Sequence, residues 1–318
     1  MATQARLSRT KHRLERDNTP NPDNLTSGYF YARKGAYMAL QVKPKIQKKA
    51  LEHVRALTLD IERVPGFARV QHRGLTVEGS FWDLNSFKHI IGRRIHPDDV
   101  VSWPRSICAA ARFYGEKEIM FASEWDDGHE GFMRKTWEWY DEATYVIGHN
   151  LQNFDSKHLK AGWAEYGWPS PSPWQTVDTL KVARAEFAFE SNTLDALCKR
   201  LGVQAKTDKY DPKIAQAAVD GDVKAQKKIR AYNCGDIKAT ESAYDRLRPW
   251  IKNHPHLGQF TGKEWSCPNC GFDGIANNPT GDAYTMVQRY RAFTCPKCNA
   301  HIRGNKKMQD PVQTRIYR

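Results

Sequence analysis

Two acids stand side by side on a strand predicted near residue 60. In the segment RALTLDIE (55–62), three apolar residues alternate with Thr58, Asp60 and Glu62. Because successive side chains of a strand point to opposite faces, Asp60 and Glu62 share one face. Their repulsion in a half-buried sheet is costly unless a cation offsets it, and a hard divalent ion with oxygen ligands is the usual solution. A solvent-exposed polar face on an edge strand would explain the pattern without any chemistry.

Two later segments carry acids suited to the same chemistry. In VIGHNLQNFDSKHL (146–159), a buried strand runs through a loop into a helix whose first turn holds Asp155. The helix dipole favours an acid there, so Asp155 alone could be a cap. Tyr232 and Asp236 are four residues apart and therefore lie on one face of a predicted helix. That pair is unremarkable in isolation.

Four of the seven cysteines form two Cys-x-x-Cys pairs separated by 24 residues: Cys267, Cys270, Cys295 and Cys298. Each pair makes a tight turn suited to two thiolate ligands, and together they predict a tetrahedral structural Zn²⁺ site. A redox or disulfide role is the alternative. Four thiolates leave no open position on the metal, so catalysis by this zinc is not expected.

The acids and the tyrosine occur in a fixed order: D-x-E, then G-H-N-x-x-x-F-D, then Y-x-x-x-D. This set, spread over Arg55 to Pro255, resembles the DEDD superfamily of 3′-to-5′ exonucleases in its tyrosine branch. It is similar to B-family DNA polymerase proofreading domains and to stand-alone bacteriophage exonucleases. The histidine branch would place His at position 231, where this chain has Ala. The resemblance implies a ribonuclease H-like α/β fold, with a mixed five-stranded sheet and helices on both faces, and the cysteine pairs resemble a zinc ribbon.

The resemblance also implies a mechanism, two-metal-ion hydrolysis at the 3′ end of a single strand. Asp60 would bridge the ions, Glu62 and Asp236 would complete the ion on the side of the attacking water, and Asp155 would hold the second ion. Tyr232 would orient that water. Mg²⁺ or Mn²⁺ suits carboxylate ligands. DNA is the expected substrate; an RNA exonuclease, or a catalytically silent nucleic-acid-binding zinc-ribbon protein, is the alternative.

The loop of the second motif holds three more candidates. His149, Asn150 and Phe154 are expected to shape the substrate pocket, with packing as an equal alternative. Asp178 lies near a strand end in VDTL and is interpreted as a helix cap, with a role at the active site as the alternative.

Periodicity predicts the elements that position these residues. Strands are expected at 55–62, 78–84, 106–115, 117–123 and 143–150, and helices at 131–143, 155–167, 192–202 and 222–250. A strand end enters a helix over 176–187. Asn192 is predicted to cap one helix with Asp195 as its capping-box partner, Gly202 to end that helix, and Gly235 to bend the last one.

The net charge of +13 is concentrated at the two ends of the chain. Residues 1–50 carry 11 Lys and Arg against 3 Asp and Glu, residues 261–318 carry 9 against 4, and the middle is neutral. Basic ends fit contact with nucleic-acid phosphates, and solubility explains them equally well. Four cations near the second cysteine pair favour phosphate contact: Lys297, Arg303, Lys306 and Lys307. Binding of a replication protein is the alternative for this part of the chain.

These observations predict a basic leader at 1–50, an exonuclease domain at 51–257, and a zinc ribbon with a basic tail at 258–318. The sequence has no run of about 18 apolar residues, and its N-terminal segment is too polar for a secretory signal. Cytoplasmic location without a membrane partner is therefore expected, in the host cytoplasm if the protein is phage-encoded. The cysteine pattern agrees with a reducing compartment.

Overall fold

The computed structural model describes residues 54–72, 74–86, 95–205, 210–285 and 288–308. The predicted leader at 1–50 and the tail beyond residue 308 lie outside these ranges.

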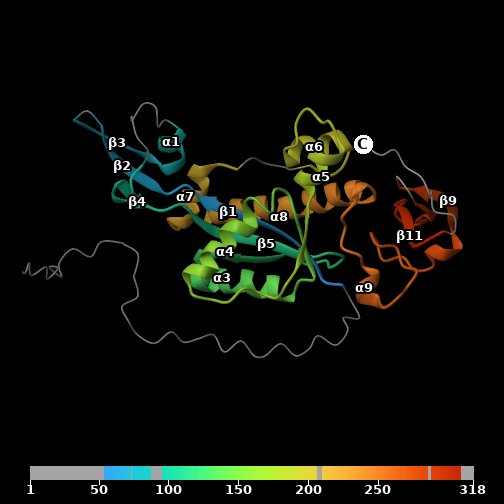
Figure 1. Ribbon diagram of the computed structural model, residues 1–318. Helices are drawn as coiled ribbons and strands as arrows, with labels where there is room; N and C mark the ends of the chain where they lie inside the picture. Colours follow the sequence, from blue (N-terminus) through green and yellow to red (C-terminus); the bar gives the residue numbers. More distant parts are fainter. Residues whose placement is uncertain (1–53, 73, 87–94, 206–209, 286–287, 309–318) are drawn as a thin grey trace, which may run out of the picture. The chain divides into compact units, whose positions relative to one another are not determined.

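A mixed five-stranded sheet forms the centre of the fold, with strand order β6-β5-β1-β7-β8 (Figure 1). β1 pairs antiparallel with β5 and parallel with β7. The strands are β1 (Ala56–Val64), β5 (Arg105–Phe113), β6 (Met120–Ser123), β7 (Tyr145–Gly148) and β8 (Gln175–Asp178). The predicted mixed five-stranded sheet is confirmed. The edge-strand explanation for the acids is wrong, because β1 is the central strand.

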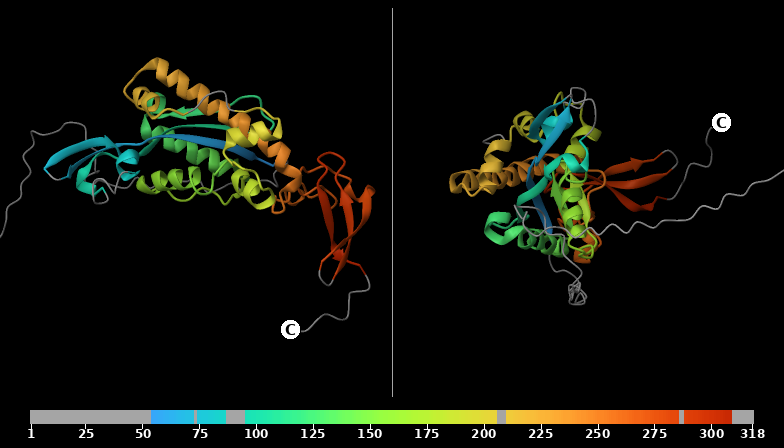
Figure 2. Two further views of the ribbon diagram at one scale, coloured as in Figure 1. Left: turned by 90° about the horizontal axis from the view of Figure 1, so that it is seen from above. Right: turned by 90° about the vertical axis from the view of Figure 1, so that its left-hand side faces the viewer.

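Helices cover both faces of this sheet. On one face lie α3 (Glu124–Glu142) and α4 (Asp155–Glu165), and on the other lie α7 (Pro212–Val219) and α8 (Val223–Leu247). Figure 2 shows β1 between the long helix α8 on one side and the helices α3 and α4 on the other. Asp222 is the N-cap of α8, and its side chain accepts from the amides of Lys224 and Ala225. The helix continues through Gly235 without interruption, and the bend at Gly235 stays a prediction.

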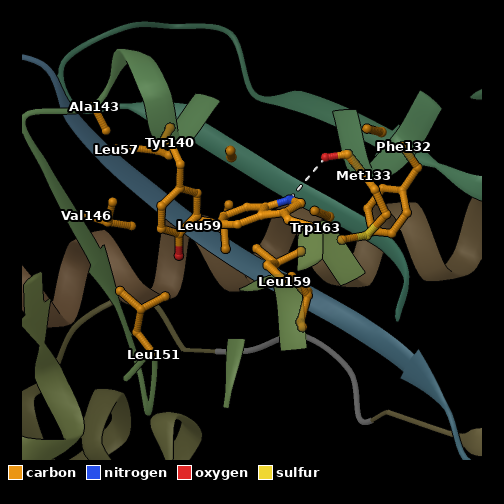
Figure 3. Close-up of a cluster of buried hydrophobic side chains, with 14 of the residues drawn as sticks. Leu57, Leu59, Phe132, Met133, Tyr140, Ala143, Val146, Leu151, Leu159 and Trp163 are labelled. Atoms are coloured by element: carbon orange, nitrogen blue, oxygen red, sulfur yellow. Dashed lines mark hydrogen bonds between the residues drawn. The ribbon is translucent and has the colours of Figure 1, made fainter. Parts of the chain in front are cut away.

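The apolar half of β1 builds the main core. Leu57, Leu59 and Ile61 are at most 3% exposed and pack with α3 and α4. Trp163 of α4 lies among these side chains and its indole Nε1 donates to the carbonyl of Met133 at 3.2 Å (Figure 3). The predicted alternation along β1 is therefore confirmed, and its polar residues face α8.

A second, small sheet follows β1. It has the order β3-β2-β4 and contains β2 (Phe67–His72), β3 (Leu75–Ser80) and β4 (Val100–Ser102). The helix α1 (Phe81–Ser86) follows β3, and the short 3-10 turn η1 (Pro97–Asp99) precedes β4. The strand predicted over 78–84 is thus wrong in its second half, since Ser80 accepts from the amide of Asp83 and starts a helix instead.

Two short helices follow β8. They are α5 (Thr179–Glu186) and α6 (Leu194–Leu201). The cap of α6 is Thr193, whose hydroxyl accepts from the amide of Ala196, so the prediction of Asn192 with Asp195 is wrong. Asp195 instead pairs with Lys199 at 2.7 Å. Gly202 ends α6 with φ +65°, as predicted.

The C-terminal part has its own three-stranded sheet, β11-β10-β9. Its elements are η2 (Arg248–Trp250), α9 (Gly258–Thr261), η3 (Ile275–Asn277), β9 (Pro279–Tyr284), β10 (Arg289–Thr294) and β11 (His301–Lys307). Its small core gathers around Cys267, Phe293 and Cys295. Arg248 Nε donates to the carbonyl of Asn269 at 3.1 Å, and Asn269 Nδ2 donates to the carbonyl of Arg248 at 2.6 Å.

Across the described ranges, every helix is too short or too polar to span a lipid bilayer.

Candidate active site and cysteine metal centre

Three of the predicted acids converge. Asp60 and Glu62 of β1 and Asp236 of α8 each place a carboxylate oxygen within 4.8 Å of the others. Glu62 is 7% exposed and Asp236 is 2% exposed, whereas Asp60 is half-buried. A set of three carboxylates this close, two of them buried, could hold a divalent cation.

Small residues on β5 make room for these acids. Asp60 lies opposite Ala110 and Glu62 lies opposite Cys108 in the antiparallel ladder. Burial raises the pKa of the Cys108 thiol well above its usual range, and the neighbouring carboxylates of Glu62 and Asp60 raise it further. Cys108 therefore stays a neutral neighbour of the acids and adds no charge to them.

Asn233 supports the cluster, although sequence reasoning missed it. Its side chain is fully buried, and Nδ2 donates to Asp60 Oδ2 at 2.7 Å and to the Asp60 carbonyl at 3.2 Å. This contact fixes which way the Asp60 carboxylate faces. The available signal was its place inside the Y-x-x-x-D segment, one residue after Tyr232.

Asp155 has a different position from the other three acids. β7 pairs with β1 only as far as Thr58, and beyond that point Asp155 Oδ1 accepts from the amide of Ile61 at 3.1 Å. Burial raises the pKa of Asp155 to about 7, against the opposing effect of the Ile61 hydrogen bond. Its oxygens are not among the set that converges within 4.8 Å.

A pocket of about 460 Å³ opens over the acids. Tyr232 lies in it one helical turn before Asp236, and its ring centroid is 6.4 Å from that of Tyr210. The lining residues come from β1, α1, the N-cap of α4, the segment before α7, and α8: Asp60, Ile61, Glu62, Arg63, Trp82, Phe154, Tyr210, Tyr232 and Asp236. Sequence reasoning did not identify Arg63, Trp82 or Tyr210, although Arg63 directly follows the D-x-E motif.

Of the three loop candidates, Phe154 lines the pocket and the other two do not. The His149 ring is hydrogen-bonded to Thr179 Oγ1 at 3.0 Å and to the Asn192 carbonyl at 2.9 Å. Asn150 has φ +67°, and its amide donates to Asp178 Oδ1 at 3.0 Å. The hydrogen bonds of both residues thus go to groups other than the carboxylates of Asp60, Glu62 and Asp236.

Asp178 caps α5, as predicted. Its side chain accepts from the amides of Leu180 and Lys181 at the start of the helix. It also accepts from the amides of Asn150 and Gln152 at 3.0 and 3.1 Å. One carboxylate thus fixes both the helix start and the loop that leads to Phe154.

The four paired cysteines come together as a second cluster. The Sγ atoms of Cys267 and Cys298 are 3.7 Å apart, and those of Cys270 and Cys295 are 3.5 Å apart. Four sulfurs at about 2.3 Å from a tetrahedral zinc ion are separated by about 3.8 Å, so the spacing fits such an ion. A hydrogen bond from Cys267, helped by Cys298 and Cys295, lowers the pKa of Cys270 to about 5. The cluster could therefore hold a metal ion such as zinc.

The two cysteine turns have the same backbone design. The amide of Cys267 donates to the Phe272 carbonyl at 2.7 Å, and that of Cys295 donates to the Ala300 carbonyl at 2.9 Å. The residue after each second cysteine has positive φ, Gly271 at +71° and Asn299 at +58°. Gly and Asn tolerate that conformation best, which explains their presence there.

The four cations predicted to contact phosphate are all exposed: Lys297, Arg303, Lys306 and Lys307. The guanidinium carbon of Arg303 lies 4.3 Å from the centroid of the Tyr290 ring, across the pair of strands β10 and β11. This contact orients one cation over an aromatic surface.

Comparison with known proteins finds likeness among solved structures only, at low sequence identity. No protein-family model and no curated protein matches the chain. Among solved structures, the family B DNA polymerase of the hyperthermophilic archaeon Pyrobaculum calidifontis matches with 16% identity and a TM-score of 0.43. The match covers 62% of this chain and 25% of the polymerase, so this chain spans about a quarter of the polymerase's length.

Proposed function

We propose that this protein is a metal-dependent phosphodiester hydrolase that removes nucleotides from the 3′ end of single-stranded DNA. The observation that carries the proposal is the convergence of Asp60, Glu62 and Asp236 within 4.8 Å, in one pocket with Tyr232. Buried carboxylates at this separation repel one another unless a cation lies between them. Their oxygen donors suit Mg²⁺ or Mn²⁺ rather than softer metals.

Bound divalent ions would supply positive charge to both the attacking and the leaving oxygens of the phosphodiester. Asp60, Glu62 and Asp236 would hold them, with Asp155 as the ligand of a second ion. Asn233 orients Asp60 through the 2.7 Å hydrogen bond to Oδ2. The Tyr232 hydroxyl would position the attacking water. We assign Tyr232 positioning alone.

The division of the chain follows the same proposal. Residues 51–257 form a ribonuclease H-like exonuclease domain, residues 258–318 form a zinc ribbon with a basic tail, and residues 1–50 are a basic leader. Zinc on the four thiolates would stabilise the ribbon by joining its two cysteine turns. The exposed Lys297, Arg303, Lys306 and Lys307 would contact nucleic-acid phosphates.

The test uses 5′-labelled single-stranded DNA and RNA of one sequence with Mg²⁺, Mn²⁺ or metal-free buffer. Asp60→Asn and Asp236→Asn remove a carboxylate from the cluster, and Glu138→Gln removes an exposed one from α3 as the matched control. We expect the wild type and Glu138→Gln to shorten the strand from its 3′ end only with metal, and both cluster variants to lose this activity. Wild-type protein that binds strands in both metals and never shortens them would refute the hydrolase and favour a binding protein. Faster shortening of RNA would reassign the substrate.

A further inference from the structure

Arg63 directly follows Glu62 on β1 and lines the same pocket. Its Nη1 donates to His158 Nε2 at 3.1 Å, and its Nη2 donates to the Pro104 carbonyl at 3.1 Å. Nε is buried and has no hydrogen-bond partner among the described residues. Two neutral acceptors therefore hold the guanidinium, and three of its five N–H groups, the one on Nε and one each on Nη1 and Nη2, have no partner among the described residues.

The charge of Arg63 is not compensated by an acid. Within the described ranges no carboxylate lies within ion-pair distance of it, although Arg55, Arg69, Arg105 and Arg112 all have such partners. Burial, together with the Arg63 charge, lowers the pKa of His158 to about 4, so near neutrality that ring is an uncharged acceptor. A half-buried cation without a counter-charge is unfavourable unless an anion reaches it.

The pocket limits what this anion can be. The converging carboxylates on its wall exclude a simple acid ligand unless cations accompany them, and Trp82 and Phe154 add two aromatic walls. The anion must therefore be linked to planar groups that can stack on these aromatic side chains, and it must bind next to the cations that the carboxylates would hold. A phosphodiester of a nucleic-acid strand meets both conditions. Base stacking on aromatic side chains and guanidinium contact with phosphate are the usual means of holding single strands.

We propose that Arg63 binds a backbone phosphate of the single strand in the pocket, with His158 and the Pro104 carbonyl holding the guanidinium in place. The inference rests on the proposed function, and it adds a substrate-positioning residue next to the carboxylates. The fork of the guanidinium matches two phosphate oxygens, which an ammonium cannot do. Arg63 is therefore expected to supply both charge and geometry.

The experiment measures binding without turnover. A 5′-fluorescent DNA strand is titrated with protein in Ca²⁺ at several salt concentrations by fluorescence anisotropy, and its length is checked on a gel afterwards. The variants are Arg63→Gln and Arg63→Lys. Arg69→Gln on β2 is the matched control, because it removes an exposed arginine charge outside the pocket. Circular dichroism and thermal unfolding show whether each variant is folded.

We expect Arg63→Gln to weaken binding about tenfold or more, since hydrogen bonds to charged groups are among the strong ones. The slope of log Kd against log salt should fall by about 0.7, the contribution of one single-strand phosphate. Arg63→Lys should keep the slope and lose part of the affinity, and Arg69→Gln should behave as wild type. If Arg63→Gln does not fold, Arg63→Lys still tests the geometry.

A scan of strands with one neutral methylphosphonate linkage then locates the phosphate. Neutralising one linkage near the 3′ end should weaken the binding of wild type. The same strand should bind the Arg63 variants almost as well as the unmodified strand does, because the variant and the neutral linkage remove the same contact. Equal affinities for wild type and both Arg63 variants, or additive losses at every linkage, would overturn the inference and leave Arg63 as a structural tie. Wild type that binds no strand at all would instead overturn the proposed function.

Discussion

The carboxylate cluster has a measurable cost when no cation is present. Coulomb's law gives about 3.5 kcal/mol for two unit charges 4.8 Å apart at an effective dielectric constant of about 20. Asp236→Asn removes two such repulsions, those with Asp60 and Glu62, and keeps the side chain's shape. Each charge is spread over two oxygens, and water reaches Asp60, so we expect a net gain of about 1 to 3 kcal/mol in metal-free buffer. With an unfolding entropy of about 2.1 cal/mol/K per residue, that gain corresponds to a rise of about 1.5 to 4.5 °C in the unfolding midpoint.

Divalent metal should reverse this order. A ligand that binds only the folded state at 100 times its Kd adds about 2.7 kcal/mol, so Mn²⁺ should raise the midpoint of the wild type well above its metal-free value. Asp236→Asn has lost a ligand and should respond much less. The two midpoints should therefore cross as Mn²⁺ is added.

The assay is thermal unfolding by circular dichroism after dialysis into metal-free buffer. The zinc content is measured before and after dialysis, so that loss of metal from the cysteine cluster is not mistaken for the effect at the carboxylates. Glu138→Gln should follow the wild type throughout. Equal midpoints for wild type and Asp236→Asn in metal-free buffer, with no response of either to Mn²⁺, would refute the idea that these carboxylates repel one another and hold a cation.

Three further variants test the surrounding contacts. Asn233→Ala removes the hydrogen bond to Asp60 and should weaken Mn²⁺ binding about tenfold, which calorimetric titration measures; unchanged affinity would show that the bond does not orient the carboxylate. Cys295→Ser should reduce bound zinc from one equivalent to nearly none by elemental analysis, and full retention would contradict a four-thiolate site. Burial lowers the pKa of His254 to about 4. Between that value and about pH 6.5, the unfolded chain therefore takes up a proton that the folded chain does not. The free energy of unfolding should decrease by up to about 3 kcal/mol as the pH is lowered through this range. Denaturant unfolding of His254→Gln should show a flatter dependence there, and identical curves would refute the assignment.

The sequence was sufficient for features that depend on local pattern. The alternation along β1 placed Asp60 and Glu62 on one face, and the helical spacing placed Tyr232 with Asp236. Both patterns are set within a few residues, so no knowledge of the rest of the chain is required. The cysteine turns are local in the same way, because Cys-x-x-Cys followed by Gly or Asn specifies the turn.

Features that depend on tertiary contacts were not predictable. Asn192 and Thr193 are both good helix caps, and only packing of α6 decides between them. The contact between Asp155 and the Ile61 amide arises because β7 is shorter than β1, which no residue near Asp155 encodes. His149 looked like a pocket residue from its motif, but its hydrogen bonds go to Thr179 and Asn192, distant in the sequence.

The position of Arg63 shows how one irregularity can change a site. Strict alternation would put Arg63 on the face opposite Glu62, away from the acids. The register between β1 and β5 shifts between these two residues, with Glu62 opposite Cys108 and Arg63 opposite Ser106. An irregularity of this kind can re-aim the side chains next to it, and here Arg63 lines the pocket together with Asp60, Ile61 and Glu62. Arg63 thus lies beside the carboxylates without an ion pair to any of them within the described ranges, which is the arrangement that a phosphate between metal ions and a guanidinium requires.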